Sequence, residues 1–393
     1  MTPAARVQSA IELLDAAIEA ARSKGPPADR ILADWFRAHR FAGSKDRRAV
    51  RELVYAAIRA CGPVPESGRA AMLRLAADDP ALAALFDGSN YGPASIAEGE
   101  AAAAGGVAPE WLVEALATSD ISGDEAAALL DRAPLDVRVN TLKADRASLE
   151  LPAEAEPIAA PNGLRLEAGT QVERWDAYRD GRIEVQDGGS QLACEAVAAK
   201  AGETVIDLCA GGGGKTLALA AAMANGGTLV AADTDRGRLS QLGPRAERAG
   251  ALVAETVLLE PGRELEALDA WRGKADAVLV DAPCSGTGTW RRNPEARWRL
   301  DPAALERFAA TQAHILAIAA EQVKPGGRLV YVVCSLLEAE GADRIAAFLA
   351  ERPDWQPDAP ELPLGRPRGH GIRLTPFHDG TDGFFIARLS KPC

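Results

Sequence analysis

The sequence predicts an α/β protein whose largest part is a mostly parallel, doubly wound sheet. From residue 181 onward, short apolar runs alternate with helical stretches. Each run is apolar throughout rather than at every second position, which is typical of strands buried on both faces. Each run also ends in a polar or reactive residue. The four predicted strands lie at 204–207, 227–233, 275–281 and 328–334.

The residues that end these runs give the first indication of a function. They are Asp207, Asp233, Asp281 and Cys334. Ligands of open α/β sheets bind outside the carboxyl ends of the strands. We therefore expect the four side chains to lie around one site.

The first 180 residues have a different character. Thr2-Pro3 is a typical helix start, and apolar residues then recur at helical spacing from Val7 to Ile18. A second helix holds Trp35 and His39, where we expect the histidine to pack or cap, and a third begins near Ser44. Residues 131–180 alternate apolar and polar positions, as short strands do. The prediction is a helical domain over 1–130, a small α+β subdomain over 131–180 and the α/β domain over 181–393.

The composition is that of a globular protein. The chain has 393 residues, of which 47% are hydrophobic and 25% charged. No apolar run approaches the roughly 18 residues of a membrane span, and acidic residues interrupt the amino-terminal helix, unlike a targeting signal. Six cysteines without a CxxC pair argue against a disulfide framework and a zinc site. We expect a cytoplasmic monomer with free thiols, no metal and no membrane partner.

Charge is distributed unevenly along the chain. The net charge of −12 by itself argues against nucleic acid as a partner, but residues 21–60 hold ten Lys or Arg against four acids. A second basic cluster follows the third strand, at Arg291, Arg292, Arg297 and Arg299. Solvated helix faces are the alternative interpretation for both clusters.

A glycine loop joins the first predicted strand to a helix, in the sequence DLCAGGGGKT at 207–216. Such loops let the backbone approach a ligand near a helix amino end. A phosphate-binding P-loop would need glycine at Cys209, and a dinucleotide fingerprint would need glycine at Thr216. S-adenosylmethionine sites accept a looser loop. They also use an acid at the end of the next strand, which here is Asp233. The loop alone leaves the three ligand classes open.

Two cysteines at strand ends indicate covalent chemistry on a pyrimidine. Cys284 stands in Asp281-Ala-Pro-Cys284, and Cys334 stands 50 residues later in Val-Val-Cys-Ser. Carbon 5 of cytosine attacks a methyl sulfonium only after a thiolate has added to carbon 6. An acid at the ring nitrogen and amino edge helps the ring to accept that charge. Either thiol could be the nucleophile on chemistry alone.

These motifs resemble those of the RsmB branch of the Nop/Sun family of RNA cytosine-C5 methyltransferases. The likeness runs through QDGGS at 186–190, DLCAGGGGKT, DAPCSGTG at 281–288, VVCS at 332–335 and DGFF at 382–385. It departs from the family in the glycine loop, which lacks the usual proline, and in Val333, where Thr is common. The resemblance implies a Rossmann-like class I methyltransferase domain with S-adenosylmethionine as cofactor.

The resemblance also implies roles for single residues. Cys334 would attack carbon 6, Cys284 would assist release, and Asp281 would hold the cytosine. The implied cofactor site consists of Cys209, Ala210, Gly211, Gly212, Gly213, Gly214, Lys215, Asp233, Glu260 and Asp281.

The family carries a NusB-like helical RNA-binding domain at its amino end, which agrees with the helical pattern of 1–130. We expect phosphate contacts from the two basic clusters, at Arg47, Arg48, Arg51, Arg291, Arg292 and Arg297. The implied substrate is RNA, with small-subunit ribosomal RNA expected. An amino-group methyltransferase would carry a (D/N)PP(Y/F) loop instead of DAPC. A ribosome-assembly factor that retains the fold without catalysis is the alternative outside enzymes.

Overall fold

The computed structural model describes residues 1–393, and helices provide the regular structure of the first 130. The first helix begins where Thr2 and Pro3 predict, since Thr2 Oγ1 accepts a hydrogen bond from Ala5 N at 3.2 Å. His39 caps the second helix, with its Nδ1 2.8 Å from Trp35 O. These helices are α1 (Pro3–Ser23), α2 (Ala28–Ala38), α3 (Ser44–Ala60), α4 (Gly68–Ala76), α5 (Pro80–Ala83), α6 (Glu110–Thr118), α7 (Gly123–Ala127) and the 3₁₀ turn η1 (Ala128–Leu130).

The helical part includes a distant piece of the chain. Met1–Asp131 and Thr289–Asp301 together form one compact unit, and the rest of the chain forms a second. We call Thr289–Asp301 the returning segment; it contains the 3₁₀ helix η5 (Pro294–Arg299). Trp298 of this segment is buried in the apolar core of the helices, and its Nε1 donates to Gly62 O at 3.2 Å. The predicted boundaries did not include this return of the chain.

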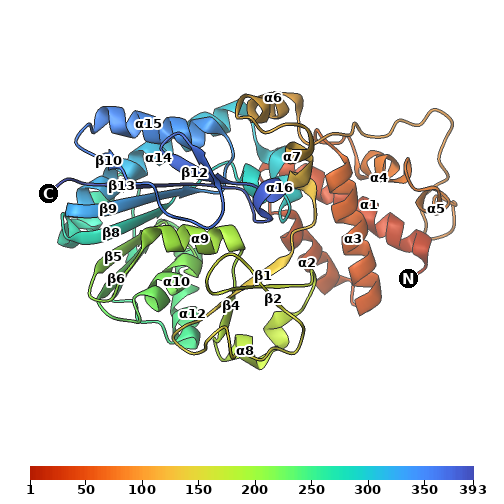
Figure 1. Cartoon of the computed structure of the whole chain (residues 1–393). Helices are drawn as coiled ribbons and strands as arrows, with labels where there is room; N and C mark the ends of the chain where they lie inside the picture. The colour runs from red at the N-terminus through yellow and green to blue at the C-terminus, as the bar shows by residue number, and fades with distance from the viewer. The chain divides into compact units, whose positions relative to one another are not determined.

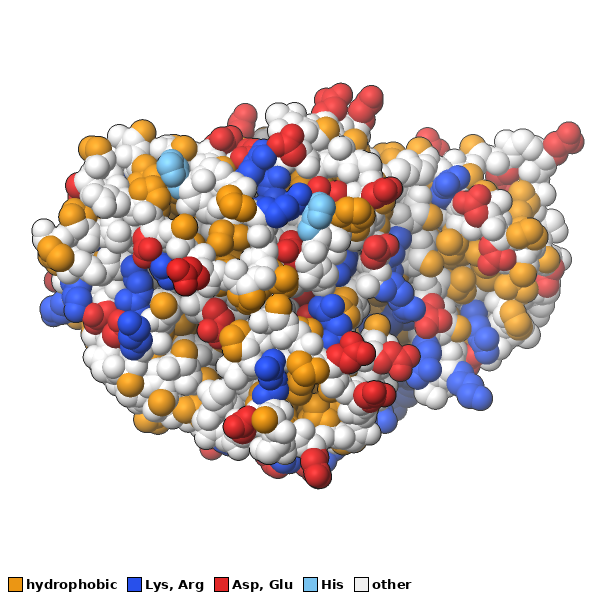
Figure 2. All heavy atoms as spheres, in the orientation of Figure 1, with side chains coloured by type: hydrophobic (Ala, Val, Ile, Leu, Met, Phe, Trp, Pro, Cys, Tyr) orange, Lys and Arg blue, Asp and Glu red, His pale blue; other side chains and the backbone are white.

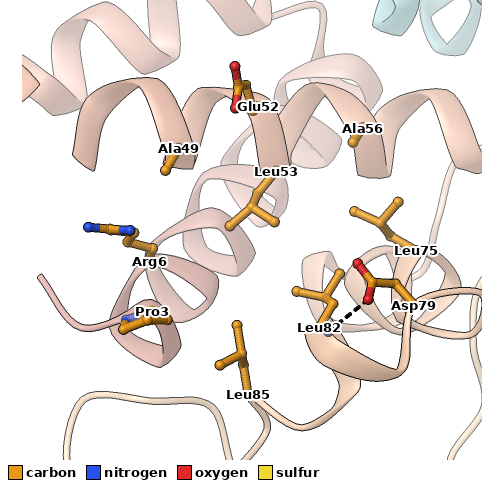
Figure 3. A pocket seen from close by; sticks show the side chains of 10 residues that line it. All are labelled: Pro3, Arg6, Ala49, Glu52, Leu53, Ala56, Leu75, Asp79, Leu82 and Leu85. Atoms are coloured by element: carbon orange, nitrogen blue, oxygen red, sulfur yellow. Dashed lines mark hydrogen bonds between the residues drawn. The ribbon is translucent and has the colours of Figure 1, made fainter. Parts of the chain in front are cut away.

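A cavity of about 400 Å³ opens between helices of this unit (Figure 3). Leu53 and Leu82 point into it, and the Asp79 carboxylate beside it accepts a hydrogen bond from Leu82 N at 3.1 Å. Its lining is thus apolar with a few charged groups. The residues around it are Pro3, Arg6, Ala49, Glu52, Leu53, Ala56, Leu75, Asp79, Leu82 and Leu85.

The second unit begins with a small antiparallel sheet. Its strands are β1 (Leu135–Val139), β2 (Glu156–Pro157), β3 (Gly163–Leu166) and β4 (Ile183–Val185), in the order β2-β3-β1-β4. A buried charge ties this sheet to the helix that begins at Gly188, because Asp136 accepts two hydrogen bonds from Arg165 and a third from Gly188 N. The fourth strand lies beyond residue 180, so the small sheet extends past its predicted boundary.

The main sheet has nine strands and confirms the predicted α/β class. Its strands are β5 (Thr204–Leu208), β6 (Thr228–Asp233), β7 (Glu255–Leu258), β8 (Ala275–Asp281), β9 (Val323–Val333), β10 (Gln356–Pro357), β11 (Arg366–Arg368), β12 (Gly371–Leu374) and β13 (Phe384–Ser390). The order is β11-β12-β13-β9-β8-β5-β6-β7, and β10 pairs with β13. Strands β9, β8, β5, β6 and β7 are parallel, whereas β13 runs antiparallel beside β9. The predicted strand at 328–334 begins earlier because an irregularity in the pairing with β8 accommodates residues 324–327.

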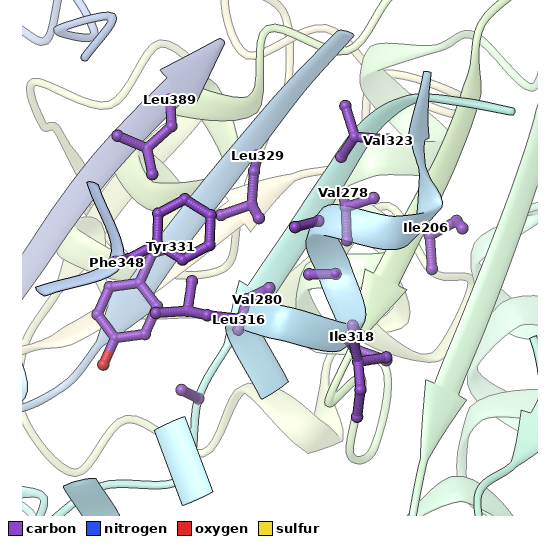
Figure 4. Packing of buried hydrophobic residues seen from close by; sticks show 14 of the residues in the cluster. Ile206, Val278, Val280, Leu316, Ile318, Val323, Leu329, Tyr331, Phe348 and Leu389 are labelled. Carbon is purple, nitrogen blue, oxygen red and sulfur yellow. The ribbon is translucent and has the colours of Figure 1, made fainter. Parts of the chain in front are cut away.

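Helices cover both faces of this sheet, as the continuous apolarity of the strands predicts (Figure 1). The helices of the unit are η2 (Val172–Arg174), α8 (Asp176–Arg179), α9 (Gly188–Val197), α10 (Gly214–Ala222), α11 (Arg236–Leu239), α12 (Leu242–Ala249), α13 (Glu264–Ala267), η3 (Asp269–Trp271), α14 (Pro302–Gln322), η6 (Glu338–Glu340), α15 (Ala342–Glu351) and α16 (Pro376–Asp379). On one face Ile206, Val278 and Tyr331 pack with α14 and α15 (Figure 4). On the other, Val205 and Leu279 pack with α9, α10 and α12. The 3₁₀ turn η4 (Thr287–Thr289) joins the two units along the chain.

None of the helices combines the length and apolarity needed to cross a bilayer. No group of three or more His, Cys, Asp or Glu side chains is placed to hold a metal ion.

Candidate active site

The parallel strands bring the predicted site residues to one edge of the main sheet. Asp281 ends β8 and pairs in register with Val332 of β9, so Cys334 follows two residues further along the neighbouring strand. Strand β5 lies on the other side of β8 and ends beside Asp207. Polar side chains from adjacent strand ends therefore meet at the carboxyl edge, which confirms the sheet argument made from the sequence.

The two cysteines are direct neighbours. Cys284 Sγ and Cys334 Sγ lie 3.5 Å apart, and both residues are only partly exposed. The hydrogen bond to Cys334 and burial raise the pKa of the Cys284 thiol well above its usual range. The loops that carry them are joined by Gly288 N donating to Cys334 O at 3.0 Å and by Ala282 N donating to Val332 O at 2.9 Å.

Lys215 forms an ion pair with Asp281. Its Nζ lies 2.7 Å from Asp281 Oδ2, and its side chain is 12% exposed. Burial alone would lower the pKa of the Lys215 ammonium. The attraction of nearby groups, chiefly the Asp281 carboxylate, is together larger than this effect, so the pKa of Lys215 is raised. The loop lysine predicted to bind cofactor thus lies against the acid predicted to hold the base.

The glycine loop has the tight geometry that its composition indicates. Cys209, Gly211 and Gly213 all have positive φ, at 73°, 54° and 86°. The position of Gly213 favours glycine because its φ of 86° is one that other residues rarely adopt, and a Cβ there would also lie 2.2 Å from Leu242 Cδ1. Asp233 fixes the loop from the next strand, because its Oδ2 accepts a hydrogen bond from Gly211 N at 2.7 Å. This bond helps to hold the turn, which lacks the proline usual in the family.

Glu260 lies apart from these groups. Its side chain is 70% exposed and pairs with Arg263 at 3.3 Å. The chain nevertheless passes close to the site, since Leu259 N donates to Asp233 O at 2.9 Å. A role for Glu260 at the adenine side of the cofactor stays a prediction.

Two basic clusters were predicted to contact phosphate, and in the structure they differ in how exposed their arginines are. In the first, Arg48 and Arg51 are exposed, whereas Arg47 is half-buried and donates to Ala42 O at 2.8 Å. Lys and Arg side chains gather over α2 and α3 in Figure 2. This face is open to a polyanion.

The second cluster is built into the helical unit, which corrects the expectation for Arg297. That side chain is 0% exposed, and its guanidinium donates to Ile58 O and Cys61 O at 2.7 and 2.6 Å. Arg299 donates in the same way to Gly25 O at 2.8 Å. Terminal helix carbonyls lack partners within their helix, and cations are favoured there.

The other two arginines of this cluster differ in exposure. Arg291 is 6% exposed, so a phosphate cannot reach it as predicted, and its carbonyl accepts a bond from Arg59. Arg292 is half-buried, and its contact with RNA stays a prediction.

Fold and site together define an S-adenosylmethionine-dependent methyltransferase domain. Residues 194–390 match the family described as 16S rRNA methyltransferase RsmB/F, and the chain belongs to that family, as its motifs indicated. A probable ribosomal RNA small subunit methyltransferase B from Bacillus subtilis is 34% identical over 300 residues, 72% of this chain and 66% of the relative. The small subunit methyltransferase B of Citrobacter koseri is 35% identical over 293 residues, with the same coverage. The match thus spans somewhat less than two thirds of these relatives.

Solved structures share the fold. The protein PH0851 has a TM-score of 0.76 at 25% identity, with 100% of this chain and 99% of that one covered. A structure of NSun6 from Pyrococcus horikoshii with SFG has a TM-score of 0.62 at 20% identity, with 72% and 98% covered.

The residues present fit S-adenosylmethionine. Asp233 offers carboxylate oxygens beside the glycine loop for ribose hydroxyls. Asp207, which was expected near the site but given no role there, is fully buried, and its Oδ2 accepts a hydrogen bond from Thr216 Oγ1 at 2.6 Å. Its Oδ1 has no hydrogen-bond partner in the protein, and a donor such as the ammonium of the cofactor would satisfy it. The amino end of α10 would receive the cofactor carboxylate.

Asp207 makes the stability of the fold depend on pH. Burial raises its pKa to about 7, compared with roughly 3.9 in an unfolded chain. Between these values the folded state keeps a proton that the unfolded state has lost, so the free energy of unfolding falls as pH rises through this window. We expect Asp207→Asn to flatten that fall and to raise the free energy of unfolding above about pH 7 by a few kcal/mol, at about 1.4 kcal/mol per pH unit. Urea unfolding at several pH values measures this, and an unchanged profile would contradict it.

Proposed function

We propose that this protein transfers a methyl group from S-adenosylmethionine to carbon 5 of a cytosine in small-subunit ribosomal RNA through a covalent cysteine–cytosine adduct. The observation that carries the proposal is the pair of thiols 3.5 Å apart at the ends of neighbouring strands, with Asp281 at the end of one of them. The names of the relatives support ribosomal RNA as the substrate.

The residues divide the chemistry among themselves. The Cys334 thiolate forms a bond to carbon 6, and Asp281 at the nitrogen edge of the ring helps it to accept the electrons. When bound, S-adenosylmethionine supplies the methyl group for carbon 5. A base then takes the carbon 5 proton, and the electrons of that C–H bond re-form the double bond between carbons 5 and 6. The bond from carbon 6 to sulfur breaks, and its electrons leave on the Cys334 sulfur as a thiolate.

The two cysteines take different steps in this scheme. We assign the attack to Cys334. Cys284 lies within hydrogen-bond distance of the departing sulfur, and we assign it to release. The family resemblance gives the same division.

Bisulfite sequencing of small-subunit ribosomal RNA tests the proposal. Cells that lack the protein should lose methylation at one or more cytosines, and the wild-type gene should restore it. Calorimetry with S-adenosylmethionine addresses the alternative of a ribosome-assembly factor without catalysis. Absent cofactor binding and an unchanged methylation pattern would favour that alternative.

We also propose that the basic face of α3 binds RNA through phosphates. Reversing Arg47, Arg48 and Arg51 to Glu should weaken RNA binding and reduce its dependence on salt, by at most about 0.7 in the logarithmic slope per lost single-strand contact. Filter binding across a salt series measures both quantities. Reversal of three exposed arginines of the other unit is the matched control, at Arg174, Arg179 and Arg272. An unchanged slope in the α3 variant would show that this face is only solvated.

A further inference from the structure

A fully buried carboxylate lies behind the two cysteines. Glu340, at the end of η6, is 0% exposed and forms no ion pair. Its Oε1 accepts hydrogen bonds from Ser285 N at 2.9 Å and from Gln312 Nε2 at 3.0 Å. Its Oε2 accepts from Ser335 Oγ at 2.5 Å and from Ser285 Oγ. Burying a carboxylate without a cation is costly, and such a group persists only when hydrogen bonds satisfy it.

The partners of Glu340 are the residues directly after each cysteine. Ser285 comes after Cys284, and Ser335 after Cys334. The two hydroxyl oxygens are also 3.0 Å apart. A serine hydroxyl has one proton to donate, and each of these two directs it to the same carboxylate. One acceptor therefore ties together the two loops that carry the thiols.

Two further contacts fix Glu340 itself. Gln312 of α14 reaches both Glu340 and Pro283 O with its amide nitrogen, each at 3.0 Å. Tyr331 of β9 donates its hydroxyl to Glu340 O at 2.7 Å. Besides the bonds from the two loops, the Glu340 carboxylate is thus held by a helix, and its backbone carbonyl is held by a strand of the sheet.

We propose that Glu340 is the positioning residue that sets the separation of the two thiols and, through its negative charge, keeps the proton on Cys284 while Cys334 attacks. This rests on the proposed function for the roles of the cysteines. Cys334 and Glu340 raise the pKa of Cys284, whereas a backbone hydrogen bond with Gly286 lowers it. Burial and Cys284 raise the pKa of Tyr331, on which Arg344 acts in the opposite direction, and Lys215 interacts with Cys334. The hydrogen bond to Cys334 and burial are the largest causes of the raised pKa of Cys284, and the Glu340 carboxylate adds to them.

Glu340→Gln tests the proposal, because it preserves the shape of the side chain and removes its charge and one acceptor. We expect kcat to fall by about 100-fold, the scale of a misplaced reacting group, without a comparable change in KM for RNA or cofactor. Glu338→Gln is the matched control on the same short helix, since that carboxylate pairs with Arg368 and Arg373. An equal loss in both variants, or a loss in KM alone, would overturn the proposal.

A second readout does not require activity. The pH dependence of iodoacetamide labelling at Cys284, followed by peptide mass spectrometry, reports when its proton leaves. In Glu340→Gln the midpoint should move to lower pH, whereas Glu338→Gln should leave it in place. A purely structural role predicts no such shift, and its absence would overturn the proposal even if wild-type protein methylated no cytosine. Conversely, a shift in protein that methylates no cytosine would refute the proposed function alone.

Should Glu340→Gln fail to fold, the serines provide the test. Ser285→Ala and Ser335→Ala each remove one link to the carboxylate. We expect each to lower kcat, and the double variant to lose less than the product of the two effects, because both act through one group. Independent effects, or none, would overturn the proposal.

Discussion

Replacing Cys334 with alanine should abolish both methylation and covalent adduct formation with RNA, because no sulfur remains to attack carbon 6. The loss should exceed that of any other single change in the site. A variant that keeps the glycine loop and Asp233 intact should still bind S-adenosylmethionine, so calorimetry provides the control. Methylation is measured by transfer of a labelled methyl group to RNA.

Cys284→Ala should behave in the opposite way with respect to the adduct. Attack by Cys334 stays possible, but release is slowed, so a protein–RNA species that survives denaturation should accumulate. A denaturing gel of each variant with RNA and cofactor shows this directly. An adduct in Cys334→Ala and none in Cys284→Ala would mean that the two roles are exchanged.

Replacing Arg297 with alanine should destabilise the helical unit. The two carbonyls at the end of α3 lose their donor, and an unsatisfied buried polar group costs about 1–3 kcal/mol. We expect the free energy of unfolding to fall by about 2–4 kcal/mol, measured by urea denaturation followed through helical circular dichroism.

Arg48→Ala is the control for this change, because its side chain is exposed and no cavity results. If the Arg297→Ala protein were as stable as the wild type but bound RNA more weakly, Arg297 would contact phosphate after all, in contradiction to its burial.

The sequence was most informative where backbone geometry alone determines position. Continuous apolar runs predict a parallel sheet, and parallel strands collect their carboxyl ends at one edge. Asp281 and Cys334 could therefore be placed together, and the structure aligns their strands in register. The glycine loop could be predicted for the same reason, because backbone with positive φ and close packing favours glycine, which is visible in the sequence.

The residues that a side chain contacts from distant parts of the chain could not be predicted from the sequence. Arg48 and Arg297 belong to equally basic stretches, yet one is exposed and the other caps a helix formed some 240 residues earlier in the chain. Glu340 is one of two glutamates on η6, and only its contacts with Ser285 and Gln312 distinguish it from Glu338. The sequence feature that could have indicated this site is the serine after each cysteine. This pair of serines suggests a shared partner only when the two loops are known to be adjacent.

The returning segment has a consequence for how the protein is made. Its residues cap three helices of the amino-terminal unit, with Glu295 accepting from Ala28 N at the start of α2, Arg297 at the end of α3 and Arg299 at the end of α1. During synthesis, residues 1–131 leave the ribosome about 160 residues before this segment does. At about 5–20 residues per second, that delay is roughly 8 to 30 s. The ends of the nascent helices lack these caps for that time, so amino-terminal fragments should be sensitive to protease until residue 301 has left the ribosome.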